Sequence, residues 1–192
     1  MSENCAFCVT PHETSALVLG AALGELGKVG RDKVTFLTSP SIRDFPVWLE
    51  QLIAESTGKD GKGIVPIVDE PLTSQRAYGA DRFFVHLFID QDENAELEGL
   101  LNALGAAGHP LVRINMTEKI DVSQEMFRWE MAVAAGGSVM GIHPFNQPNV
   151  EMSKELARQM MDKSRKGALA EEAVETVSVE DPEALVKAVG SW

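Results

Sequence analysis

Asp81-Arg-Phe-Phe-Val-His-Leu-Phe-Ile89 is the stretch of sequence that decides the fold. It is nearly continuous in apolar residues, and such a run is typical of a parallel β-strand that is covered on both faces. Further strands are predicted at 34–38, 64–68, 110–114 and 175–179. Pro66 indicates that the second of these lies at a sheet edge or is irregular, because proline cannot donate to a ladder.

Segments with apolar residues at helical spacing stand between these strands. They cover 12–29, 44–55, 94–107, 123–139, about 148–163, and 182–189. Helices that alternate with buried strands predict an open, mainly parallel sheet with helices on both faces. We therefore expect an α/β three-layer sandwich of about five strands. Residues 1–11 form an N-terminal tail in this interpretation, and 12–192 form a single domain.

Composition restricts the class of protein. The 192 residues include 17 Lys and Arg against 29 Asp and Glu, a formal net charge of −12. Nucleic acid and anionic membrane surfaces are unsuitable partners, because phosphate binding needs clustered basic residues. No apolar run reaches the roughly 18 residues of a membrane span, and the start lacks the pattern of a signal peptide. A cytoplasmic location is the expectation.

Cys5 and Cys8 form a Cys-x-x-Cys pair in the tail. A structural zinc site needs four ligands, and here only His12 lies near. A redox pair should follow a strand and open a helix, and that context is missing as well. We expect the pair to have no function.

The chemistry concentrates in Gly137–Lys154. The stretch begins as an apolar helix, breaks at Pro144 and restarts as a polar helix near Pro148. Gln147, Glu151 and Lys154 are spaced i, i+4 and i+7, which places them on one helix face. Free N–H groups at a helix start, with an amide and an ammonium, suit an anionic, hydroxyl-rich ligand. The alternative is a helix start that only caps itself.

Two segments carry a resemblance to a known family. Phe145-Asn-Gln-Pro-Asn-Val-Glu-Met-Ser-Lys154 resembles the C-terminal signature of phosphoglucose isomerases, with Asn149 at a position where the family has Gly or Ala. Gln51-Leu-Ile-Ala-Glu-Ser-Thr-Gly-Lys59 is similar to the family segment that carries the catalytic base. The further segments 30–40, 54–66, 78–82 and 127–130 look most like the isomerase half of bifunctional transaldolase/phosphoglucose isomerases. The resemblance spans about 15–165 and implies a sugar isomerase (SIS) domain with a flavodoxin-like fold.

The resemblance assigns roles to three residues. Glu55 matches the base that moves a proton between C1 and C2 of a hexose phosphate through an enediolate. Lys154 matches the lysine beside the sugar ring oxygen, and Gln147 matches a glutamine that lines the ligand site near the phosphate. The residues alone also allow an ion pair between Glu55 and Lys59 one turn on, and a merely solvated Lys154. The family reaction needs no metal or organic cofactor.

Other family motifs are missing from the sequence. The first SIS subdomain, with its Ser-x-Ser-Gly-Thr-Thr phosphate loop and Gly-Gly-Arg arginine, has no counterpart, and His86, His109 and His143 lack the setting of the ring-opening histidine. We therefore expect the second SIS subdomain of a glucose-6-phosphate isomerase, inactive alone and a homodimer in solution. Its expected partners are the missing subdomain and, in a fused protein, a transaldolase domain. The alternative is a non-catalytic sugar-phosphate sensor or regulatory module.

The sheet also predicts where the two catalytic candidates lie. Ligands of parallel sheets gather at the carboxyl ends of the strands. We expect the helix of Lys154 to begin at that edge and Glu55, at the end of its helix, to face the opposite edge. Glu55 and Lys154 should then both be at least partly exposed, on a surface that the partner subdomain completes.

Overall fold

The computed structural model describes residues 14–92, 95–165 and 186–187. The chain divides into two compact units, with the division between Gln147 and Pro148. In the described residues, the first unit holds the sheet and the helices between Ser15 and Met140, and the second holds the helix Pro148–Arg165. The predicted Cys5–Cys8 pair, the strand at 175–179 and most of the helix at 182–189 fall outside the described residues.

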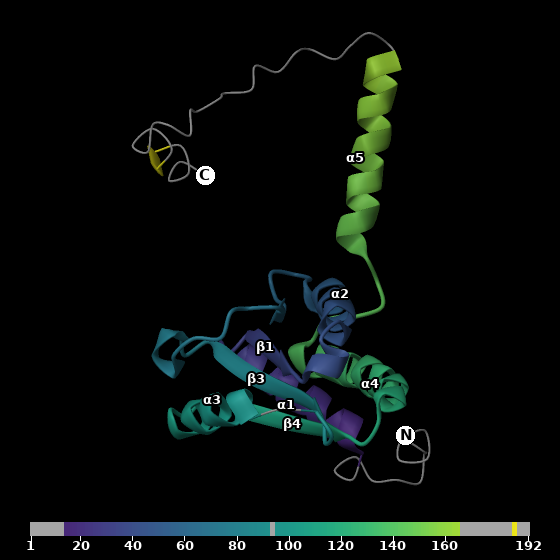
Figure 1. The fold of residues 1–192 in the computed structure, drawn as a ribbon. Helices are drawn as coiled ribbons and strands as arrows, with labels where there is room; N and C mark the ends of the chain where they lie inside the picture. The colour runs from purple at the N-terminus through teal and green to yellow at the C-terminus, as the bar shows by residue number, and fades with distance from the viewer. Residues whose placement is uncertain (1–13, 93–94, 166–185, 188–192) are drawn as a thin grey trace. The chain divides into compact units, whose positions relative to one another are not determined.

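A four-stranded parallel sheet forms the centre of the first unit (Figure 1). The strands β1 (Lys33–Thr38), β2 (Val65–Ile67), β3 (Arg82–Ile89) and β4 (Leu111–Met116) lie in the order β2-β1-β3-β4. Val34 pairs with Pro66 on one side and with Phe83 on the other. Pro66 thus lies on an edge strand, as predicted. The described residues contain four strands where the sequence predicted five, because the fifth falls on 175–179.

The helices also agree with the predicted ranges. They are α1 (Ser15–Lys28), α2 (Phe45–Thr57), α3 (Ala95–Ala106) and α4 (Val122–Met140), with short 3₁₀ turns at Pro40–Ile42, Gln75–Ala77 and Lys119–Asp121. Gly58 ends α2, and Gly141 ends α4 in the left-handed conformation with φ 67°. This conformation carries little penalty in glycine, which explains the sharp break before Pro144.

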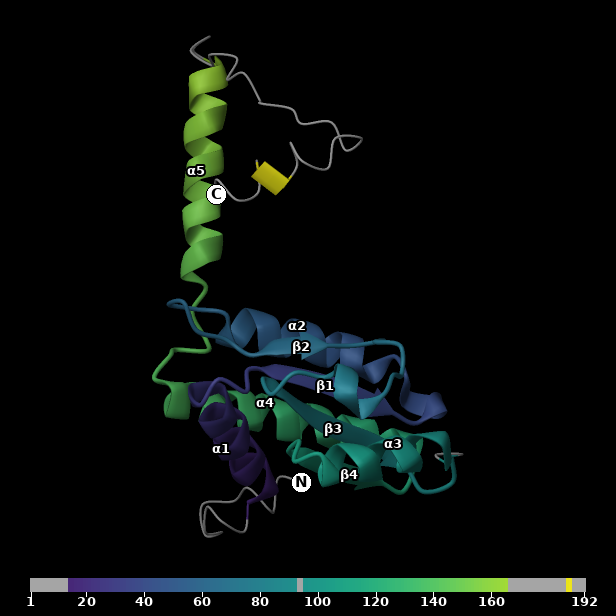
Figure 2. The same cartoon turned by 90° about the vertical axis from the view of Figure 1, so that its left-hand side faces the viewer.

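The sheet lies between two helical layers, which confirms the predicted αβα sandwich. Phe83, Val85 and Leu87 of β3 belong to a core cluster with residues of α1, α2 and α4. Phe84 points to the other face and packs with Leu101 and Leu104 of α3. Figure 2 shows α3 in front of the sheet and α4 behind it. The chain steps in opposite directions from β1 to β2 and from β3 to β4, so right-handed crossovers place α2 and α3 on opposite faces.

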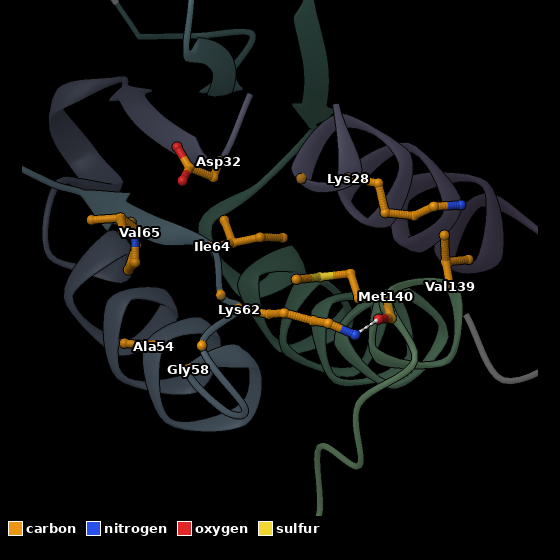
Figure 3. Close-up of a pocket in the computed structure, with 13 residues that line it drawn as sticks. Lys28, Asp32, Ala54, Gly58, Lys62, Ile64, Val65, Val139 and Met140 are labelled. Carbon is orange, nitrogen blue, oxygen red and sulfur yellow. Dashed lines mark hydrogen bonds between the residues drawn. The ribbon is translucent and has the colours of Figure 1, made fainter. Parts of the chain in front are cut away.

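The helices α1, α2 and α4 end close together, at the amino ends of the strands. Because α1 leads into β1 while α2 and α4 follow strands, all three run back toward the amino ends of the strands. A hollow at this edge is lined by residues from the end of each helix, among them Gly27, Ala54 and Met140 (Figure 3). The turn after α2 and the loop after α4 therefore leave the sheet at the same place.

The second unit is described by α5 (Pro148–Arg165). Met152, Leu156 and Met160 recur every four residues and so follow one face of this helix. The ion pairs Glu151–Lys154 and Glu155–Arg158 follow another part of its surface. Within the described ranges, no helix is long and apolar enough to cross a membrane.

Candidate functional site

A polar hollow of about 360 Å³ lies beside α2 in the first unit. One face of α2 supplies most of its wall, since the residues recur at spacings of three and four. The remaining wall comes from α4 and from the loop that follows it. The lining residues are Trp48, Gln51, Leu52, Glu55, Ser56, Glu130, Pro144 and Gln147. The volume is within the range of small-molecule sites.

Glu55 stands in the last turn of α2 and is exposed, as predicted. Gln51 Nε2 donates to Glu55 Oε1 at 3.2 Å, one helical turn earlier. Within the described part of the chain, no hydrogen bond reaches Glu55 Oε2. One carboxylate oxygen is therefore held by the helix and the other is open to a ligand.

The alternative ion pair between Glu55 and Lys59 is not formed. Lys59 Nζ instead donates to the main-chain oxygens of His143 at 3.1 Å and Pro144 at 2.8 Å. Lys59 belongs to the Glu-Ser-Thr-Gly-Lys run, where the sequence indicates for it only a pair with Glu55. Lysines that bind distant carbonyls leave no local pattern in a sequence.

Gln147 lines the same hollow as Glu55. It lies just outside α5, which begins at Pro148. Glu55 lies toward the amino ends of the strands, as predicted, because α2 runs back to them. The prediction that the helix of Lys154 begins at the carboxyl ends was wrong, because the segment that leads to it follows α4 and leaves the sheet at the amino ends. Glu55 and Gln147 line one hollow because α2 and α4 both run back to the amino ends of the strands.

Lys154 belongs to α5 and therefore to the second unit. Its Nζ donates to Glu151 Oε1 at 2.8 Å, three residues earlier in the same helix. This hydrogen bond holds the pKa of Glu151 below its usual range. A place for Lys154 beside the ligand stays a prediction.

The hollow has an acidic lining. Glu55 and Glu130 contribute carboxylates, and no Lys or Arg is among the lining residues. Glu130 was not singled out as a site residue from the sequence, although it closes the Phe127–Glu130 segment of the resemblance. Gln51 and Gln147 supply amides, which can both donate and accept hydrogen bonds to sugar hydroxyls. The phosphate of a sugar phosphate would need cationic groups from elsewhere.

A second, larger hollow of about 740 Å³ lies between the ends of α1, α2 and α4 (Figure 3). Its lining is mainly glycine and apolar residues, and its polar side chains already have partners. Lys28 pairs with Glu25, Asp32 with Lys33, and Lys62 with the carbonyl of Met140. Neither Glu55 nor Gln147 lines it, so we place the candidate site in the smaller hollow.

None of the three described histidines lines the smaller hollow. His143 is exposed on the loop before Gln147, and the ring of His109 packs edge-on against Phe84. His86 is fully buried on β3, where its ring stacks on Phe88 with 4.7 Å between centroids. Burial lowers the pKa of His86 to about 4. Within the described ranges, no group of three or more His, Cys, Asp or Glu is placed to hold a metal ion.

Because His86 is buried, we expect the free energy of unfolding to depend on pH. Among the described residues, neither ring nitrogen has a hydrogen-bond partner, so burial keeps His86 neutral in the folded chain. Between pH 6.5 and about 4 the unfolded chain binds a proton that the folded chain does not, so stability falls as the pH falls. His86→Phe should remove about 2 kcal/mol of the loss that wild type suffers between pH 7 and pH 5. Urea unfolding at each pH measures it.

The exposed His143 offers the matched control for this measurement. His143→Gln removes an exposed histidine from the loop before Gln147 and is measured in the same way. Parallel pH curves for wild type and His86→Phe would contradict the account of a buried neutral histidine.

Comparisons with known proteins agree with the family resemblance at a coarse level. No family model matches the chain. The chain is 27% identical to the glucose-6-phosphate isomerase of Parabacteroides distasonis, over 79% of this chain and 42% of that protein. It is 28% identical to the probable glucose-6-phosphate isomerase of Halobacterium salinarum, over 78% of this chain and 43% of that protein.

This chain is similar in sequence to glucose-6-phosphate isomerases. It spans less than half the length of these two relatives. The fold also resembles the crystal structure of a hypothetical protein from Thermus thermophilus, with a TM-score of 0.64 and 19% identity. That match covers 80% of this chain and 46% of the Thermus chain, and it supports the fold alone.

Proposed function

We propose that this chain is the C-terminal SIS subdomain of a glucose-6-phosphate isomerase, of the kind that is fused to a transaldolase. The observation that carries the proposal is the single hollow shared by Glu55 and Gln147, which lie far apart in the sequence. The resemblance assigns roles to both residues, and it is independent of the geometry. The names of the relatives support an isomerase rather than a sensor.

In the proposed reaction Glu55 is the base. Its open oxygen Oε2 takes the C2 proton of the aldose phosphate and returns it to C1 of the enediolate, while Gln51 fixes the other oxygen. Gln147 orients the sugar through hydrogen bonds from its amide. The resemblance gives Lys154 the role of the lysine at the ring oxygen, where an ammonium balances the charge that develops on ring opening.

We propose that the other half of the site lies on a first SIS subdomain. The acidic lining of the hollow supports this, because a phosphate dianion needs positive charge, and no Lys or Arg lines the hollow. The missing arginine would supply that charge, and the missing phosphate loop would supply further donors. Without them the chain can hold the sugar but cannot fix the phosphate.

The isolated chain should therefore show no appreciable isomerisation of glucose 6-phosphate. A coupled assay that follows fructose 6-phosphate formation by the purified chain measures this. Turnover near the roughly 10 per second of a median enzyme would contradict the proposal that the site is incomplete.

We also propose that the chain associates with a second copy in solution when the first subdomain is absent. The apolar face of α5, with Met152, Leu156 and Met160, is one surface that such association can bury. Light scattering at high protein concentration should give a mass above that of one chain. A clean monomer would contradict this.

A further inference from the structure

A tight hairpin follows Glu55 directly. Lys59 and Lys62 form an antiparallel bridge, with N–H to O bonds of 3.1 Å and 2.9 Å between them. Asp60 and Gly61 make the turn with φ of 55° and 69°, the left-handed pair that a two-residue hairpin requires. Opposite residues of an antiparallel pair place their side chains on the same face. The side chains of Lys59 and Lys62 therefore lie on the same face of the hairpin.

Both lysines bind the segment that leads to Gln147. Lys62 Nζ donates to the oxygen of Met140, the last residue of α4, at 2.9 Å, the dashed line in Figure 3. Lys59 Nζ donates to the oxygens of His143 and Pro144. The carbonyl end of a helix favours a cation, which accounts for Lys62. Lys59 reaches beyond that end, into the loop itself.

Lys59 differs from Lys62 in its surroundings. It is only 4% exposed, whereas Lys62 is exposed. Neither ammonium is paired with a carboxylate in the part of the chain that the structure describes. A buried ammonium is costly unless it is hydrogen-bonded, so the two carbonyls of the loop are what makes this position tolerable for a lysine. The loop and Lys59 consequently hold each other in place.

The hydrogen bonds of Lys59 join the two segments that form the walls of the smaller hollow, α2 and the loop after α4. Gly58, at the start of the hairpin, ends the helix that carries Glu55, and Pro144, at the far end, lines the hollow with Gln147. We propose that Lys59 is a positioning residue: from behind the wall, through the carbonyls of His143 and Pro144, it fixes the Gln147 loop against Glu55. This inference rests on the proposed function, because it concerns the binding of a sugar phosphate in that hollow.

The test uses the full chain and three variants. Lys59→Met removes the ammonium and keeps the length of the side chain, Lys59→Arg keeps the charge and the donors, and Lys62→Met removes the neighbouring bond to Met140 as a matched control. Two quantities are measured by NMR: the backbone order parameters of His143, Phe145, Asn146 and Gln147, and the Kd for fructose 6-phosphate.

Lys59→Met should lower the order parameters of the loop from the rigid value near 0.85 toward the flexible range below about 0.6. It should also weaken fructose 6-phosphate binding about tenfold, because a loop that has lost its charged hydrogen bonds no longer holds Gln147 in the hollow. Lys59→Arg should restore most of the affinity. Lys62→Met should leave both quantities within about twofold of wild type, since it does not contact the loop beyond Met140.

Three results would overturn the inference. An unchanged loop in Lys59→Met shows that the lysine does not hold it. Lower order parameters in the loop with an unchanged Kd for fructose 6-phosphate show that Lys59 stabilises the loop without affecting ligand binding. Equal effects of Lys59→Met and Lys62→Met show that the contact with the loop is not specific.

Two further outcomes keep the test decisive. If Lys59→Met does not fold, Lys59→Gln, which keeps N–H donors without the charge, takes its place with the same expected direction. Wild type that does not bind fructose 6-phosphate at all refutes the proposed function, while the order parameters still decide whether Lys59 fixes the loop.

Discussion

Glu55→Gln is expected to lower turnover at least about 100-fold in an enzyme that contains this chain and a first SIS subdomain, the loss typical of a missing general base. Glutamine keeps the size and the hydrogen bond with Gln51 but cannot accept the C2 proton. Because Glu55 is exposed in the last turn of α2, the same change should alter the free energy of unfolding by no more than about 1 kcal/mol. Glu55→Gln should therefore lower turnover without a matching loss of stability.

A chimaera makes this measurable. The chain replaces the matching part of the Parabacteroides distasonis isomerase, which is 42% of that protein. Glu50→Gln is the matched control, since Glu50 is exposed on the same helix and does not line the hollow. Normal turnover in the Glu55→Gln chimaera would refute the role of Glu55 as the base. A loss of similar size in Glu50→Gln would show that the effect is not specific to the site.

Gly20→Ala should destabilise the fold by about 3 kcal/mol or more, although alanine favours helices. A Cβ at Gly20 overlaps the carbonyl oxygen of Ala132 and lies 2.7 Å from the Cβ of Ala135. The atom in its way belongs to the backbone of α4, so no rotamer change relieves the overlap and the helices must separate. Urea unfolding of the chain measures the change.

Gly99→Ala is the control for this prediction. Gly99 lies within α3, and a Cβ there meets nothing within 4 Å. This substitution should stabilise the chain by up to about 1 kcal/mol, the helix preference of alanine over glycine. If Gly20→Ala and Gly99→Ala change the free energy of unfolding by the same amount, α1 and α4 do not approach each other as closely as described.

The sequence predicted most of the fold because the apolar patterns are local. The buried run of β3 and the helical spacing of its neighbours determined the element types. Pro66 indicated either an edge strand or an irregular one, and β2 is the edge strand. The order of the strands and the contact between Gly20 and α4 could not be predicted, since both depend on packing between segments far apart in the chain.

The site was predictable to a smaller degree. Glu55 and Gln147 came from motif resemblance, and their common hollow required knowing that α2 and α4 both end at the amino edge of the sheet. Ligand sites of parallel sheets lie at the carboxyl ends of the strands, but the segment of Gln147 follows a helix and therefore starts from the amino ends. Lys59 was missed because its acceptors are main-chain oxygens, which every residue has and no motif marks.

An NMR titration of the chain with fructose 6-phosphate tests most directly whether this hollow is half of a sugar phosphate site. The account predicts saturable shifts at Gln51, Glu55, Ser56 and Gln147, with a Kd of about 1 mM or weaker because the phosphate loop is absent. Inorganic phosphate alone should not reproduce these shifts. Shifts that do not saturate at tens of millimolar, or that gather around Gly61 and Val139 in the larger hollow, would contradict it.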